Sequence, residues 1–238
     1  MLPLCRWFLR APRVWSRELT VCGGRALGQR GPGRPYSQKQ RSFWVALRRW
    51  LRGPPVPPFP RPCLVGEPVL RARAAPVPTA EVTGPEVQRL VAALVRTMRR
   101  LGALGLSAPQ LGVSLQVMVL EVTQEILEAE APAARQARDM VTVPLRIFIN
   151  PRLRVIDSTT AVWPEACHSV PGYAACVPRY RAVEVTGLNE HGKTVCWRTS
   201  GWTARILQHE MDHLNGQHYI DKMDSGTFEN VHWMEEND

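Results

Sequence analysis

Residues 208–216 read QHEMDHLNG, and within them His209, Glu210 and His213 fit the pattern His-Glu-x-x-His. On a helix, side chains four residues apart share one face with Cβ atoms about 5–6 Å apart, close enough to hold one metal ion. A catalytic site of this kind normally has three protein ligands and one position for water. The motif therefore requires a helix here and a fold that brings a third ligand to it.

A second helix is predicted by hydrophobic periodicity. After Pro85, apolar residues recur at i, i+3, i+4 and i+7 as far as Leu101, which predicts an amphipathic helix over residues 85–101. The helix that carries the motif should begin near Ser200 or Thr203 and stop at Gly216.

Strands are predicted between these helices. LQVMVLEV at 115–122 reads as a buried strand, and RIFINPRLRVI at 146–156 as extended structure interrupted by Pro151. RAVEVTGL and KTVCWRT flank the turn NEHG and predict a β-hairpin, whereas residues 121–140 are typical of a surface helix or loop. The expected fold class is α+β, with mixed or antiparallel sheets packed around a central helix that bears the motif.

Charge is distributed unevenly along the chain. Residues 1–60 hold twelve Arg and Lys against one acid, Glu18, a net charge of +11. Because the whole chain carries +9, residues 61–238 carry −2, which gives no support for direct nucleic-acid binding. No run of 18 apolar residues occurs, so we expect no membrane partner.

The basic segment has the composition of an organelle transit peptide, with Arg, Trp, Leu and Phe but almost no acids. The alternative is a disordered basic arm that stays on the protein. GPPVPPFPRP at 53–62 reads as a stiff extended linker. We therefore interpret residues 1–60 as a mitochondrial transit peptide with a Pro-rich linker, and residues 61–238 as the catalytic domain, in the mitochondrial matrix.

The third ligand has several candidates. A metzincin would place a third His at position 219, which is Tyr219, and His218 is out of register by one. A gluzincin would use a downstream Glu, for which only a short polar tail remains. Upstream, Cys167 lies in WPEACHSVPGY, and a thiolate is a good ligand for a borderline metal already held by two imidazoles.

Three motifs together resemble one family. EACHS at 165–169 resembles the EGCLS motif of peptide deformylases, QHEMDHLNG their HExDH motif, and ALGLSAPQLG at 103–112 their GxGxAAPQ motif. With GEPVLRARA at 66–74, the resemblance covers roughly residues 62–225 in the family's order. It implies removal of the formyl group, as formate, from the initiator formyl-methionine of nascent, mitochondrially translated polypeptides.

The resemblance also implies a site. Cys167, His209 and His213 would bind one divalent metal, ferrous iron in the family, with zinc, cobalt or nickel as substitutes. Glu210 would take a proton from the attacking water and deliver it to the departing amine. Gln110 and the backbone N–H of His168 would stabilise the oxyanion.

Substrate contacts are expected from three further residues. Gly105 would lie along the bound peptide, and Trp202 and Ile206 would wall a pocket for methionine, although both side chains fit a core equally well. Nascent formyl-methionyl peptides are the implied partner. A homodimer and a transient contact with the mitochondrial ribosome are further expectations.

The chain departs from the family pattern at four positions. Ala103 and Ala166 replace Gly, Ser107 replaces Ala, and His168 puts a titratable imidazole where the family has Leu. A Gly to Ala change is harmless at negative φ and strained at positive φ. Two alternatives therefore stay open: a zincin-like metallopeptidase, and a degenerate module that holds formylated chains or metal without turnover.

Overall fold

The computed structural model describes residues 56–233, so the leader predicted over residues 1–60 lies almost wholly outside the described residues. From Phe59 on, the Pro-rich segment is docked and does not act as a free linker. The Phe59 N–H donates to the Leu111 carbonyl oxygen at 2.8 Å, and the Cys63 N–H to the Gln110 carbonyl oxygen at 2.7 Å. None of the described helices is both long and apolar enough to cross a membrane.

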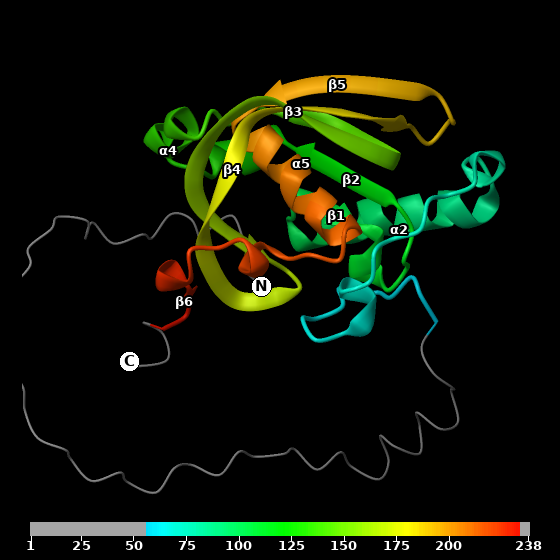
Figure 1. Cartoon of the computed structure of the whole chain (residues 1–238), viewed down its shortest axis with the longest axis horizontal. Helices are drawn as coiled ribbons and strands as arrows, with labels where there is room; N and C mark the ends of the chain where they lie inside the picture. Colours follow the sequence, from blue (N-terminus) through cyan, green and yellow to red (C-terminus); the bar gives the residue numbers. More distant parts are fainter. Residues whose placement is uncertain (1–55, 234–238) are drawn as a thin grey trace, which may run out of the picture. The chain divides into compact units, whose positions relative to one another are not determined.

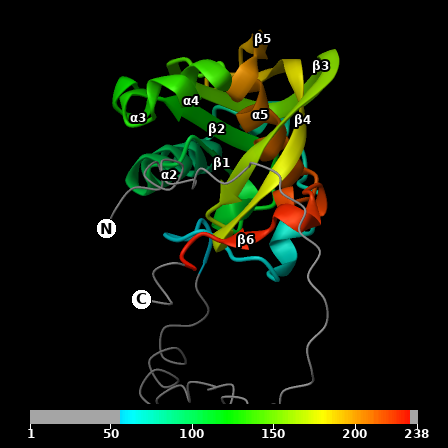
Figure 2. The same cartoon turned by 90° about the vertical axis from the view of Figure 1, so that its left-hand side faces the viewer.

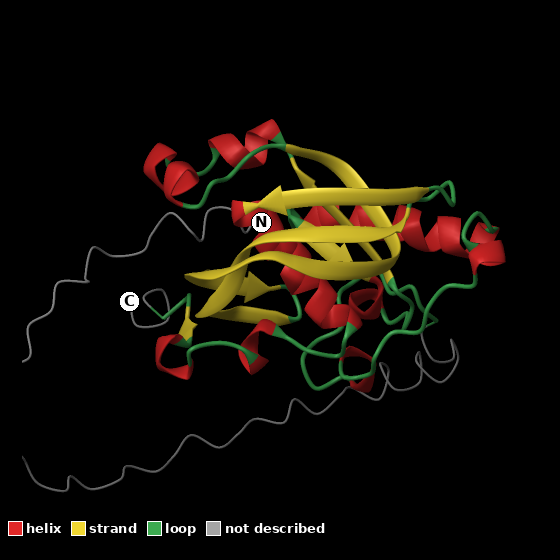
Figure 3. Cartoon of the chain, turned by 45° about the horizontal axis from the view of Figure 1, so that its top comes forward, coloured by secondary structure: helices red, strands yellow, loops and turns green. Residues whose placement is uncertain are grey.

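One antiparallel sheet forms the frame of the molecule (Figures 1 and 3). Its strand order is β1-β2-β3-β4-β5, and β6 pairs with β4. The strands are β1 (Gly105–Ser107), β2 (Val117–Val122), β3 (Val143–Cys167), β4 (Val170–Leu188), β5 (Thr194–Ser200) and β6 (Glu229–Asn230). The expected α+β class is confirmed, and the sheet is antiparallel throughout.

The helices occupy the predicted segments. They are α2 (Pro85–Leu101), α3 (Gln124–Glu128), α4 (Pro132–Ala137) and α5 (Gly201–Leu214), with short 3-10 turns that include η4 (Ala108–Leu111) and η5 (Tyr219–Asp221). The prediction for residues 85–101 is confirmed, and Ser200 is the N-cap of α5. The hairpin around NEHG is confirmed too, with Leu188 opposite Thr194.

Strand β2 is buried on both faces, as its unbroken apolar run predicts. Met118, Leu120 and Val122 point into the core that contains α5, and Val117 and Val119 into the core beneath α2. Figure 2 shows α2 and α5 on opposite sides of this strand. The β2 strand thus separates two hydrophobic cores and fixes α5 over the sheet.

Strand β3 is longer than the sequence indicates, running through Pro151 and Pro164 without ending. The register against β4 shifts between Ile149 and Arg152, so Pro151 sits at a bulge where its missing N–H breaks no ladder hydrogen bond. A further shift falls at Ala166 and Cys167, where the β3–β4 hairpin closes. This turn places Cys167 at the end of the strand.

The start of α5 needs glycine. Gly201 has φ +60°, and a Cβ there would lie 2.6 Å from the Cβ of Asp139. The helix is buried on nearly all sides: only Gly201, His209 and Met211 are partly exposed. It contacts all five of the strands β1 to β5. The motif residues are therefore held on a rigid element.

Candidate active site

The structure brings the three expected ligand residues together. Cys167 ends β3, and His209 and His213 lie one turn apart on α5; one ligand atom from each lies within 4.8 Å of the others. The Cys167 Sγ is 3.3 Å from His213 Nε2. One thiol and two imidazoles form a donor set that fits a borderline divalent metal with a fourth position for water.

A buried ion cluster fixes His209. The Glu165 carboxylate lies 3.0 Å from His209 Nδ1 and accepts two hydrogen bonds from Arg179, each 2.8 Å, and one from Arg205 at 2.7 Å. Arg179 also donates to Asp212 at 2.6 Å. A carboxylate behind a ligating imidazole sets its tautomer and orientation, so Glu165 leaves His209 Nε2 available to a metal.

The two imidazoles differ in charge preference. Burial disfavours a charge on His209, but its contacts with Cys167 and Glu165 outweigh this and raise its pKa well above the ordinary value. Burial and the neighbouring charge of His209 lower the pKa of His213 well below it. Both pKa shifts describe the histidines without a bound metal ion. A metal ion would take the place of the proton on His209.

Glu210 points into the site from α5 and is 3% exposed. Its Oε2 accepts a short hydrogen bond from the Ser107 hydroxyl, so the Ser that departs from the family pattern contacts the expected proton shuttle. Burial raises the pKa of the Glu210 carboxyl above its ordinary value. A carboxyl with a raised pKa is a stronger base once it is ionised, which suits a group that takes a proton from water.

Gly105 leaves room for this carboxylate. A Cβ at position 105 would lie 2.6 Å from Glu210 Oε1, a separation that real Cβ atoms do not show. The structure thus assigns Gly105 a steric role beside Glu210. Among the described strands, β1 pairs with β2 alone, so it forms an edge of the described sheet.

Gln110 lies beside the sulfur. Its Nε2 donates to Cys167 Sγ at 3.5 Å and to Ser169 Oγ at 3.3 Å, and its Oε1 accepts the Ser107 N–H at 2.9 Å. The amide is 2% exposed and held by η4. Its N–H group therefore faces the ligand cluster, where an oxyanion donor is expected.

The remaining departures are accommodated. Asp139 and Asn150 are the non-glycine residues with positive φ in the described segment, so Ala103 and Ala166 are unstrained. Burial, with the charge of His209, lowers the pKa of His168 to about 4, which makes this imidazole neutral at pH 7. The substitution at His168 therefore adds no charge to the site at neutral pH.

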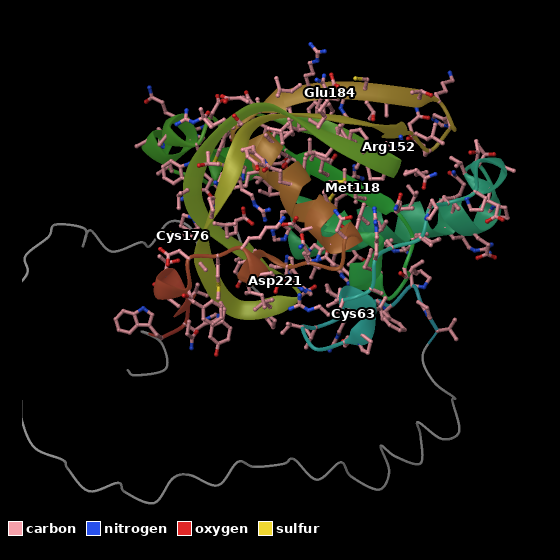
Figure 4. All side chains as sticks on the ribbon, in the orientation of Figure 1. Cys63, Met118, Arg152, Cys176, Glu184 and Asp221 are labelled. Carbon is pink, nitrogen blue, oxygen red and sulfur yellow. The ribbon has the colours of Figure 1, made fainter. Side chains whose placement is uncertain are left out.

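Trp202 and Ile206 are both buried, 6% and 7% exposed, and belong to the core shared with Met118 and Leu120. Figure 4 labels Met118 near α5. Trp202 also lines a surface cavity together with Trp163. Packing in the core thus accounts for both side chains, and their contact with a methionine side chain stays a prediction.

Several residues of the site were missed by the sequence analysis. Glu165 begins the EACHS motif, which was a usable signal. Arg179 and Arg205 reach the cluster from β4 and from the first turns of α5, and no local pattern identifies them. Asp212, within the helix motif, holds Arg179 and Lys222 and takes no part in the ligand cluster.

Arg179→Met should destabilise the fold, because it leaves Glu165 and Asp212 buried without their main counter-ion. Removing one partner of a buried pair costs about 3–5 kcal/mol in the free energy of unfolding. Arg179 and His209 hold the pKa of Glu165 well below its ordinary value, although burial alone would raise it. Because the pKa of Glu165 is lower in the folded than in the unfolded protein, its ionised carboxylate stabilises the fold at pH values above the unfolded pKa. This stability is lost as the pH falls toward the folded pKa.

The measurement is denaturant unfolding of the full chain with chelator at pH 7 and pH 3. The variant should lose stability at pH 7, and its difference from the parent should shrink at pH 3, because the parent loses the Glu165 contribution as the pH falls below the unfolded pKa of that carboxyl. Arg99→Met is the control, since the Arg99–Glu121 pair is exposed and should matter little. Equal stabilities for the two variants would contradict a structural role for the cluster.

Comparisons with known proteins agree with this geometry. The family model described as polypeptide deformylase matches residues 63–229. The mitochondrial peptide deformylase of Homo sapiens is 55% identical over 241 residues, covering 99% of this chain and 97% of the relative. The chloroplastic peptide deformylase 1A of Solanum lycopersicum is 41% identical over 166 residues, covering 70% of this chain and 60% of the relative.

Solved structures show the same fold. A class I type b peptide deformylase from Acinetobacter baumannii matches with a TM-score of 0.60 and 29% identity, covering 69% of this chain and 98% of that one. The peptide deformylase from Thermotoga maritima matches with a TM-score of 0.58 and 30% identity, covering 69% and 97%. The motifs, the ligand cluster and these similarities agree, and the chain belongs to the polypeptide deformylase family.

Proposed function

We propose that this protein is a mitochondrial peptide deformylase, which hydrolyses the N-formyl group of formyl-methionyl nascent peptides and releases formate. The observation that carries the proposal is the cluster of Cys167, His209 and His213 beside Glu210, in a chain that is 55% identical to a mitochondrial deformylase. The family is metal-dependent. The zincin-like alternative is not favoured, because the family match extends over most of the described residues.

In this proposal α5 is the central helix of the catalytic domain, residues 61–238, and Cys167, His209 and His213 hold one divalent metal. When bound, such an ion acidifies a water and polarises the formyl carbonyl. Ferrous iron is the proposed native ion, with zinc, cobalt or nickel as substitutes. The mixed sulfur and nitrogen donor set supports a borderline metal and does not choose among these.

The side chains around the ligands supply the proton and oxyanion chemistry. Glu210 takes the proton of the attacking water and returns it to the amine as the C–N bond breaks; its burial and raised pKa support this role. Gln110 donates an N–H to the developing oxyanion, supported by its position beside Cys167. The backbone N–H of His168 is proposed as a second donor.

The substrate is proposed to bind along β1. Strand β1 lies at the edge of the described sheet, where an extended peptide can add as a further strand near Gly105. Trp202 and Ile206 would then face the methionine side chain. A transient contact with the mitochondrial ribosome and a homodimer are kept as proposals that rest on the family resemblance.

The decisive experiment measures formate release from a formyl-Met peptide, with the metal content determined on the same sample of the full chain. We expect formate in proportion to bound metal and no cleavage of an unformylated peptide. Internal cleavage would support a zincin-like peptidase instead. Binding of metal without formate release would indicate a module that has lost turnover.

The leader gives a separate prediction about localisation. Residues 1–60 fused to a fluorescent reporter should carry it into mitochondria and be removed there, because their +11 charge is drawn inward by the membrane potential. Microscopy and immunoblotting check both effects. A variant with Arg6, Arg10, Arg13 and Arg17 changed to Gln is the control and should import poorly. A diffuse cytosolic signal from the unmodified leader would contradict the proposal.

A further inference from the structure

His218 lies between α5 and η5 and is fully buried, at 0% exposure. Neither of its ring nitrogens has a hydrogen-bond partner within residues 56–233. Buried polar side-chain atoms nearly always have such partners, so an imidazole with two unsatisfied nitrogens requires an explanation. The explanation lies in its neighbour.

His218 packs edge-on against the ligand residue His213, with ring centroids 5.5 Å apart and an interplanar angle of 87°. His213 Nε2 faces Cys167 Sγ at 3.3 Å, and its Nδ1 is a third buried nitrogen without a partner in the described part of the chain. If Nε2 binds a metal, the neutral imidazole must carry its hydrogen on Nδ1. That buried N–H needs an acceptor.

The other ligand shows what such support looks like. Behind His209, the Glu165 carboxylate lies 3.0 Å from Nδ1 and is itself held by Arg179 and Arg205. Ligating histidines almost always have a partner of this kind on their second nitrogen. No carboxylate contacts His213 in this way among the described residues, and the neighbouring imidazole is that of His218.

His218 is in turn placed by Asp221, which Figure 4 labels on the segment after α5. Its Nδ1 lies 3.8 Å from Asp221 Oδ2, and its backbone N–H donates to the same oxygen at 2.7 Å. Arg71 Nη1 holds that oxygen from the other side at 2.5 Å. A neutral imidazole has one acceptor nitrogen and one donor nitrogen, so His218 has the groups to serve both His213 and Asp221.

We propose that His218 is a positioning residue for His213: in the metal-loaded protein it accepts the Nδ1 hydrogen of His213, a hydrogen bond that the described residues do not make here, and its own N–H is directed to Asp221, which Arg71 anchors. The two ligand histidines then have different supports. His209 is backed by a carboxylate directly, and His213 by a carboxylate through a second imidazole. The inference rests on the proposed metal site.

The test uses the full chain and Zn²⁺ alone, titrated in competition with a chromophoric chelator. His218→Leu removes the acceptor and should weaken Zn²⁺ binding by about 10–100-fold. His218→Gln restores an acceptor and a donor and should bind within a few fold of the parent. Tyr219→Phe is the matched control: it loses one buried hydrogen bond, 3.0 Å to the Tyr173 carbonyl oxygen, without touching His213 Nδ1.

Two further readouts separate positioning from packing. With chelator present, the unfolding midpoint of His218→Leu should be no lower than that of Tyr219→Phe, because the metal-free protein gains nothing from a buried unsatisfied imidazole. In the Co²⁺-loaded protein, the visible absorption bands should shift for His218→Leu and stay at the parent position for Tyr219→Phe.

Unchanged Zn²⁺ affinity in His218→Leu, or an equal loss of affinity in the Leu and Gln variants, would overturn the inference about His218 and leave the proposed metal site standing. If the Leu variant does not fold, the His213 Nδ1–H resonance in ¹⁵N spectra of the Zn²⁺-loaded parent decides. It should exchange slowly and move in His218→Gln, and an unmoved resonance would overturn the inference. A parent chain that binds no Zn²⁺ would overturn the proposed metal site as well.

Discussion

Glu210→Gln should keep the metal ion bound and reduce formate release by between about 10²- and 10⁴-fold, the usual contribution of a positioned general acid–base. Glutamine has nearly the same shape and can still accept the Ser107 hydroxyl hydrogen. The substitution therefore leaves no cavity at this buried position, where Glu210 is 3% exposed. It cannot take a proton from water. The loss should appear in kcat, with little change in KM.

The measurement is the rate of formate release at saturating formyl-Met peptide, with metal content determined on each sample. Glu121→Gln, at a carboxylate paired with Arg99 away from the ligand cluster, is the control and should behave like the parent. Ser107→Ala should have a smaller effect than Glu210→Gln, because it removes a contact of the carboxylate and keeps the carboxylate itself. Near-normal turnover in Glu210→Gln would show that another group moves the proton.

Local patterns in the sequence predicted most of the secondary structure. The apolar stripe after Pro85 defines α2, because burial on one face of a helix leaves a periodic pattern, and the run at 115–122 defines β2, because burial on both faces of a strand leaves an unbroken apolar run. The length of β3 could not be predicted in this way. Pro151 suggested an interruption, and only the register against β4 shows the bulge that accommodates it.

The site was predicted where its residues lie in motifs and missed where they meet through the fold. The two helix histidines are four residues apart, so their proximity follows from helix geometry. Glu165 and Arg179 are 14 residues apart on paired strands, and their contact depends on the register of a long hairpin. His218 was noticed only as a ligand in the wrong register.

Steric requirements around Glu210 could not be predicted from the sequence either. Gly105 was assigned to substrate binding from a motif, and this stays a prediction. The structure adds that its missing side chain makes space for Glu210, which lies 105 residues further along the chain. Ser107 was noted only as a departure from the family pattern, and in the structure its hydroxyl contacts the same carboxylate. Both facts depend on the approach of β1 to α5, which no local pattern records.

Cys167→Ser should remove most of the metal and nearly all formate release, although both histidines stay intact. Cys167 is 8% exposed, and its Sγ accepts hydrogen bonds from the Ser169 N–H at 3.4 Å and from Gln110 at 3.5 Å, which hold the sulfur in the ligand cluster. A serine hydroxyl is a shorter and poorly acidic donor. Zn²⁺ affinity should fall by more than the roughly 10–100-fold that loss of an outer contact typically costs.

Zn²⁺ competition and formate release measure the two effects, and two other cysteines provide matched controls. Cys176 is partly buried on β4 and Cys196 exposed on β5, and neither belongs to the ligand cluster, so Cys176→Ser and Cys196→Ser should leave both properties nearly unchanged. A Cys167→Asp variant offers an anionic ligand and should recover part of the Zn²⁺ affinity. If Cys167→Ser bound Zn²⁺ stoichiometrically and released formate like the parent while a control variant did not, the third ligand would be a different sulfur.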